Sequence, residues 1–123
     1  MRIKDLMKKP IVIEKDMQLS NAAKLMNKNS INSLIVEKEG NILGIITNHD
    51  LVKYFGESKN VSEIMTKNVI TLRDKDPIKK AIELARDKNI GIFPVVDSKN
   101  KIVGIIDSKD LIKLWDNEDF LID

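Results

Sequence analysis

Apolar positions recur along the chain in two patterns, one typical of buried strands and one typical of amphipathic helices. Short apolar segments at residues 11–13 and 69–72 predict a first strand in each half of the chain. Each segment precedes a stretch with apolar residues at i, i+3, i+4 and i+7, which form one face of a helix. In the second of these helices we expect Asp76 at the N-cap and Pro77 at the first helical position.

Two further strands and a final helix are expected in each half. The strands are predicted at residues 34–36, 42–46, 94–96 and 102–106. Because they are nearly continuous runs of Ile, Val and Leu, we expect them to be buried on both faces. The final helices are expected to begin near Asp50 and Asp110.

The two halves are copies of one unit of roughly 60 residues, because whole segments recur in register. Residues 3–7 recur as 61–65, and residues 42–46 recur as 102–106. We therefore expect a first unit at 1–56, a linker at 57–60, a second unit at 61–116 and an acidic tail at 117–123. A unit this small buries little apolar area alone, so we expect the copies to pack sheet against sheet with pseudo-two-fold symmetry.

Composition narrows the possible chemistry. The chain has 123 residues, no cysteine and one histidine, which argues against disulfides, thiolate sites and histidine-rich metal sites, so no metal or cofactor is expected. Net charge is +2, with 21 basic and 19 acidic residues, so general attraction to nucleic acid or membrane is not expected. No apolar run approaches membrane-spanning length and the start lacks the core of a signal peptide, so we expect a cytoplasmic protein.

Several short motifs carry a family resemblance. They are Asp-Leu-Met at 5–7, Glu-Ile-Met at 63–65, Ile-Asn-Ser-Leu at 31–34, the segment 90–97, and Gly-Ile-Ile with an Asp six residues after the Gly at 44–50 and 104–110. Each copy resembles a CBS domain, and the tandem pair resembles a Bateman module, over residues 2 to 116. The resemblance implies an α/β (α+β) fold of two β-α-β-β-α units. It also implies two clefts between the copies that bind AMP, ADP, ATP or S-adenosylmethionine.

The resemblance further implies a regulatory role without catalysis. Members of the family commonly regulate an enzyme, channel or transporter, and they commonly form homodimers through their helices. Exposed apolar positions on the final helices also favour a homodimer here. A ligand-independent interaction or scaffold domain is the alternative, and an RNA-binding module ranks third because the charges are balanced.

The first copy carries the full site pattern of Gly, two apolar residues, Thr and, three residues later, Asp. By resemblance, Thr47 would contact phosphate and Asp50 would hold the ribose hydroxyls. The alternative is that Thr47 only ends a strand and Asp50 only caps a helix.

The second copy departs from this pattern, because Asp107 replaces the hydroxyl residue while Asp110 is kept. An ionised carboxylate repels phosphate. The second cleft would then take a ligand with a positive or neutral tail, stay vacant, or have Asp107 paired with Lys109 or Lys113. A catalytic or magnesium-binding role for Asp107 and Asp110 is geometrically possible, but the first copy lacks the pair and no motif of a catalytic nucleophile accompanies it.

The walls for an adenine base are the remaining site prediction. By resemblance they are Ile11 and Val12 in the first copy, and Val69, Ile70, Phe93 and Pro94 in the second. The alternative is that these residues belong to the core. His49 and Lys109 precede the two Asp residues and could neutralise phosphate, or simply face solvent.

Overall fold

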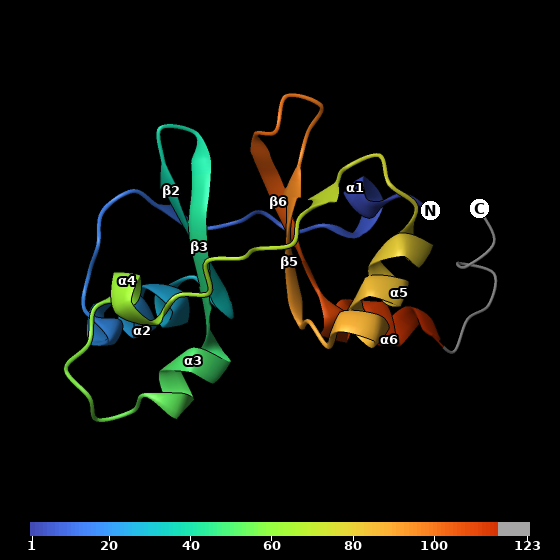
Figure 1. Ribbon diagram of the computed structural model, residues 1–123. Coiled ribbons are helices and arrows are strands. Elements are labelled where there is room, and N and C mark those ends of the chain that lie inside the picture. The colour runs from blue at the N-terminus through green and yellow to red at the C-terminus, as the bar shows by residue number, and fades with distance from the viewer. Residues whose placement is uncertain (116–123) are drawn as a thin grey trace. The chain divides into compact units, whose positions relative to one another are not determined.

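Each copy of the repeat builds a three-stranded sheet with helices beside it, and the predicted α+β class is confirmed (Figure 1). The computed structural model describes residues 1–115, so the predicted tail at 117–123 lies outside the described residues. The strands are β1 (Val12–Ile13), β2 (Ser33–Lys38), β3 (Asn41–Thr47), β4 (Leu72–Arg73), β5 (Ile92–Val96) and β6 (Ile102–Asp107). The helices are α1 (Ile3–Leu6), α2 (Leu19–Lys28), α3 (Asn48–Lys53), α4 (Val61–Ile64), α5 (Ile78–Lys88) and α6 (Ser108–Trp115).

The two sheets have the same topology. In each, the first strand runs parallel to the second, and the second runs antiparallel to the third. The expected burial on both faces is confirmed for β2 and β5, and the adjacent β2 residues Leu34 and Ile35 are both 0% exposed. It is wrong for the start of β3, where Leu43 is 41% exposed. Neighbouring residues of a strand point to opposite faces. Leu34 therefore joins the core under the helices, whereas Ile35 lies on the other face.

The two compact units of the structure do not coincide with the two sequence repeats, because the short segment at the start of each repeat belongs to the other unit. One unit comprises Ile11–Val69 and is called here the Asp50 unit. The other comprises Met1–Pro10 together with the chain from Ile70 onward and is called the Asp110 unit. The start of the first copy therefore packs with the second copy, and the start of the second copy packs with the first.

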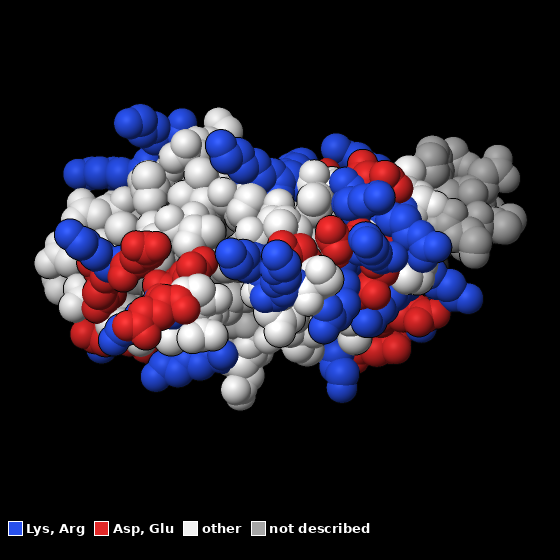
Figure 2. Space-filling model, turned by 90° about the horizontal axis from the view of Figure 1, so that it is seen from above, with Lys and Arg blue, Asp and Glu red and all other residues white. Residues whose placement is uncertain are grey.

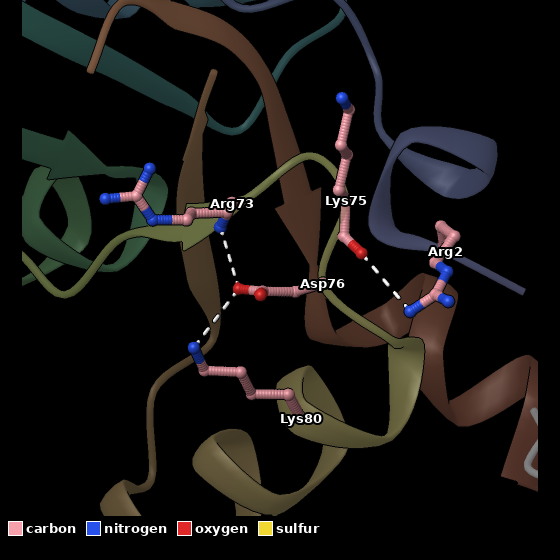
Figure 3. A network of polar contacts seen from close by, with 5 residues as sticks. All are labelled: Arg2, Arg73, Lys75, Asp76 and Lys80. Atoms are coloured by element: carbon pink, nitrogen blue, oxygen red, sulfur yellow. Dashed lines mark hydrogen bonds and ion pairs between the residues drawn. The ribbon is translucent and has the colours of Figure 1, made fainter. Parts of the chain in front are cut away.

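One buried isoleucine, two backbone hydrogen bonds and one side-chain hydrogen bond hold residues 2–4 in the Asp110 unit. Ile3 is fully buried in the core that also contains Phe93. The N–H of Ile3 donates to Asp76 O at 2.8 Å, and the N–H of Lys4 donates to Asp74 O at 2.9 Å. Figure 3 shows the Arg2 guanidinium donating to the carbonyl oxygen of Lys75, at 3.3 Å.

The corresponding segment of the Asp50 unit is held in the same way. Val61 is fully buried, and its N–H donates to Met17 O at 2.8 Å. The Ser62 hydroxyl donates to Asp16 Oδ2 at 2.5 Å, and the Ser62 N–H donates to Asp16 Oδ1 at 3.0 Å. The hydroxyl bond is the largest influence on Asp16, and with the backbone bonds it lowers the pKa of that carboxyl although burial opposes it.

The predicted start of the second long helix was wrong by one residue. Pro77 is the N-cap, with extended dihedral angles, and α5 begins at Ile78. Asp76 does not cap the helix, because its carboxylate accepts from the Arg73 N–H at 2.9 Å and from Lys80 Nζ at 3.2 Å. The strand predicted at 69–72 also begins later, at Leu72, because only Leu72 and Arg73 pair with β5.

Candidate functional site

The turn from β3 into α3 brings Thr47 and Asp50 together. Thr47 is the N-cap of α3, and Asp50 lies in the first turn of the helix. Asp50 Oδ2 accepts from the Thr47 N–H at 2.9 Å and from the Thr47 hydroxyl at 3.3 Å. Both residues are half-buried, so part of each still reaches the surface. The capping role foreseen as the alternative is therefore present, and the second carboxylate oxygen, Oδ1, accepts no hydrogen bond from the described residues.

The sheet topology places the predicted base wall at the same end of the sheet as Thr47. Val12 pairs with Ile35, and Ser33 pairs with Thr47. Since β1 and β2 both start where β3 ends, Val12 and Thr47 are separated by about two residue steps along β2. Val12 is 36% exposed, whereas Ile11 packs partly against the core. His49 is exposed on the first turn of α3.

Ser33 is a site residue that the sequence analysis did not single out. Its side chain is 1% exposed, and its hydroxyl has no hydrogen-bond partner among the described protein atoms. It lies beside Thr47 in the register of the sheet. A buried hydroxyl without a protein partner usually meets water or a ligand atom. The signal in the sequence was a serine at the start of an apolar strand, which by itself is also typical of a strand edge.

The corresponding turn of the Asp110 unit has different contacts. Asp107 Oδ1 accepts from the backbone N–H of Lys109 at 2.9 Å. Asp110, which is 14% exposed, forms an ion pair with Lys8 Nζ at 3.1 Å and a longer one with Lys113 Nζ at 4.0 Å. The Lys113 ammonium therefore pairs with Asp110 and not with Asp107. Lys8 was not predicted as a site residue, because it lies about 100 residues away in the sequence and in the other copy of the repeat.

The predicted base-wall residues of the second copy are placed unequally. Phe93 is fully buried in the core and Pro94 is also fully buried, so both fit the alternative interpretation as core residues. Val69 and Ile70 are half-buried and precede β4. Val69 ends the Asp50 unit, while Ile70 begins the second part of the Asp110 unit. Lys109 is exposed.

Two hollows in the surface lie beside the helices, one in each unit. The first, of about 320 Å³, is lined by residues that include Leu19, Ala23, Leu51, Tyr54, Phe55 and Lys59. The second, of about 380 Å³, is lined by residues that include Ile82, Ala85, Ile90, Ser108, Leu111 and Ile112. Neither contains Asp50 or Asp110, so these hollows are features of the helical faces. Among residues 1–115 no helix has the length and apolarity to cross a membrane.

Comparison with known proteins gives a consistent family assignment. The family profile described as CBS domain matches residues 3–57 and 61–117. A CBS domain-containing protein of Dictyostelium discoideum is 35% identical, over 91% of this chain and 89% of its own length. An L-aspartate semialdehyde sulfurtransferase of Methanocaldococcus jannaschii is 37% identical, over 92% of this chain but 23% of its own length. The chain thus spans about a quarter of the length of the first curated relatives that it matches.

A solved structure shares both the fold and much of the sequence. It is a CBS domain pair in complex with 5′-methylthioadenosine and S-adenosyl-L-methionine. Its TM-score is 0.86 and its identity is 35%, with 96% of this chain and 98% of that chain covered.

Proposed function

Because the chain belongs to the CBS domain family and contains two copies of the domain, we propose that it is a regulatory, non-enzymatic module that binds an adenosine-type ligand. The observation that carries this proposal is the pairing of Thr47 and Asp50 at the start of α3. Support also comes from the solved CBS domain pair at 35% identity, which binds two adenosine compounds.

The chemistry of the turn suits a ribose and a phosphate. Asp50 uses Oδ2 for Thr47, so Oδ1 can accept hydrogen bonds from the ribose hydroxyls. The Thr47 hydroxyl can turn from Asp50 to donate to a phosphate oxygen, because the 3.3 Å bond that it gives up is long and therefore weak. The buried Ser33 hydroxyl lies beside Thr47 and can bond a ligand atom. The exposed Val12 offers an apolar surface to a base.

Regulation requires that the ligand bind two arrangements of the protein with different affinities. We propose that AMP, ADP, ATP or S-adenosylmethionine shifts the protein toward the arrangement that a partner recognises. The partner is proposed to be an enzyme or a transporter, and the proposed location is the cytoplasm.

A ligand-independent scaffold is the second candidate function. The apolar hollows on the helical faces favour it, because a partner protein could cover them.

RNA binding has weaker support. In Figure 2, Lys and Arg side chains are interspersed with Asp and Glu side chains on the face shown. A nucleic-acid site usually presents an unbroken basic patch or stripe.

We also propose a homodimer, which rests on apolar side chains that the helical faces expose. Phe55 is 90% exposed, Val52 is 76% exposed and Ile112 is 67% exposed. Val52 lies on α3 and Phe55 follows it, whereas Ile112 lies on α6. Covering such side chains with a second copy would remove apolar area from water at about 25 cal/mol per Å².

A thermal-shift panel tests ligand binding directly. AMP, ADP, ATP, 5′-methylthioadenosine and S-adenosylmethionine are added in turn at millimolar concentration. At about 100 times Kd, a ligand of the folded state adds roughly 2.7 kcal/mol to the free energy of unfolding, which raises Tm visibly. A Tm that none of the five compounds changes would leave the scaffold function as the better account.

A further inference from the structure

Lys8 lies at the candidate site of the Asp110 unit although it belongs to the first copy of the repeat. Its N–H donates to Ile105 O at 2.9 Å, and the Ile105 N–H donates to Lys8 O at 2.9 Å. Ile105 lies on β6, two residues before Asp107. The lysine side chain extends from this position to Asp110, with Nζ 3.1 Å from Oδ2.

The backbone of Lys8 is fixed, whereas its side chain is free to change partner. The preceding residue, Met7, packs so closely on Gly104 that a Cβ added there would lie 2.5 Å from its Sδ. Earlier in the segment, Ile3 is fully buried, and the Arg2 guanidinium is hydrogen-bonded to the Lys75 carbonyl oxygen, as Figure 3 shows. The Lys8 side chain is nevertheless 66% exposed, whereas the Asp110 side chain is 14% exposed and also lies 4.0 Å from Lys113 Nζ. Because the Lys8 ammonium is mostly in water, it can move to another anion at small cost, and Lys113 still faces the Asp110 carboxylate.

The two turns differ at several matched positions, and at two of them a hydroxyl side chain is replaced by a charged one. Thr66 pairs with Ile45 in the Asp50 unit as Lys8 pairs with Ile105 in the Asp110 unit. Thr47 of β3 corresponds to Asp107 of β6. At these two positions Asp50 is accompanied by two hydroxyls, whereas Asp110 is accompanied by the Asp107 carboxylate and the Lys8 ammonium. Lys113 adds a longer ion pair to Asp110, at 4.0 Å. The extra negative charge of Asp107 comes with an extra positive charge from Lys8.

We infer that Lys8 sets the ligand specificity of the Asp110 turn and selects a nucleoside with a zwitterionic tail, an inference that rests on the proposed function. Asp110 accepts hydrogen bonds from the ribose hydroxyls, and Lys8 moves from Asp110 to an anionic group of the tail. Asp107 attracts the cationic group of the same tail. A phosphate tail would meet Lys8 but would also face two carboxylates, which repel it. A tail without charge would leave the Lys8 ion pair in place and gain nothing from Asp107.

Calorimetric titration of the whole chain tests this inference with two ligands that share one nucleoside. S-Adenosylmethionine has a zwitterionic amino-acid tail, and 5′-methylthioadenosine lacks it. An Asp50→Asn background weakens binding at the other turn and keeps an oxygen that can accept from the Thr47 N–H. In this background, Lys8→Gln is expected to weaken the binding of S-adenosylmethionine by about tenfold, since a charged hydrogen bond is lost. The same substitution should change the affinity for 5′-methylthioadenosine by less than about threefold.

Lys9→Gln is the matched control, because Lys9 is the next residue and is also exposed. It should alter the binding of neither ligand. If Lys8→Gln weakens both ligands equally or neither, the specificity role is excluded while ligand sensing stands. If the unaltered chain binds neither ligand nor AMP, the proposed function falls and the role of Lys8 falls with it.

Discussion

Asp50 and Asp110 occupy the same position of the repeat but have different partners. Asp50 accepts from the N–H and the hydroxyl of Thr47, whereas Asp110 pairs with the ammonium of Lys8. Asp107 has no hydroxyl to donate to Asp110, and its carboxylate instead accepts from the backbone N–H of Lys109. One repeated aspartate therefore supports two turns of different charge, which is the basis for expecting different ligands at them.

Asp76 gives a pH-dependent prediction that involves no ligand. Burial alone would raise its pKa, but donation from the Arg73 N–H and from Lys80 outweighs burial and lowers the pKa below its ordinary value of 3.8 (Figure 3). A lowered pKa adds stability above the ordinary value, and this stability is lost as pH falls through the lowered pKa. Asp76→Asn should therefore cost about 1 kcal/mol near neutral pH and less near about pH 3, which lies below the ordinary value. Urea unfolding of both proteins at the two pH values measures this, and an equal cost at both would contradict it.

Single residues were predictable where a local pattern defines their role. Thr47 and Asp50 follow from the spacing of one strand-to-helix turn, and the structure brings them together. Lys8 and Ser33 were not predictable in this way. The role of Lys8 depends on a contact between distant segments, and the burial of Ser33 depends on the packing around its strand.

The exchanged segments are fixed by a methionine placed over a strand glycine in each unit. A Cβ added at Gly104 would lie 2.5 Å from Met7 Sδ and 2.8 Å from Met7 Cγ. A Cβ added at Gly44 would lie 2.6 Å from Met65 Sδ and 2.9 Å from the Thr66 carbonyl oxygen. These distances are shorter than van der Waals contact, so both strands need glycine for the segment to lie against them.

Gly104→Ala should therefore displace the segment that carries Lys8. We expect a loss of about 1–3 kcal/mol in the free energy of unfolding, as for other overpacked sites. Gly91→Ala is the control, because the nearest atom to its added Cβ is Ser108 Oγ at 3.8 Å. In a Met7→Ala background, Gly104→Ala should cost less, because the clashing Sδ and Cγ are gone. An equal cost in both backgrounds would show that Met7 is not the cause.

The strands and the longer helices were predictable, but the short helices α1 and α4 and some boundaries were not. Periodicity gave the strands and long helices, because one buried face imposes a regular spacing of apolar residues. The late starts of β4 and α5 were not predictable, since Asp76 bonds the Arg73 N–H and not a helix N–H. The exchange of the segments at 1–10 and around 61–69 was also not predictable from the repeat, because both copies carry the same apolar pattern there.

For the molecule as a whole, the exposed apolar side chains lead to a prediction about assembly. Phe55→Ser should weaken the proposed homodimer by at least about fivefold, because an aromatic side chain at the centre of an interface can contribute more than about 1 kcal/mol. Lys53→Ser changes an exposed residue on the adjoining α3 and is the control. Sedimentation velocity over a range of concentrations measures both variants. A wild-type protein that stays monomeric at high micromolar concentration would contradict the homodimer.

The central claim is that the Asp50 turn holds the ribose of an adenosine-type ligand. Calorimetric titration of AMP into the unaltered chain and into Asp50→Asn tests it most directly, because the variant keeps an oxygen that can accept from the Thr47 N–H. We predict saturable binding to the unaltered chain, weakened in the variant by about 1.5–3 kcal/mol, which is roughly ten- to a hundredfold. Absence of binding, or the same affinity in both proteins, would contradict the claim.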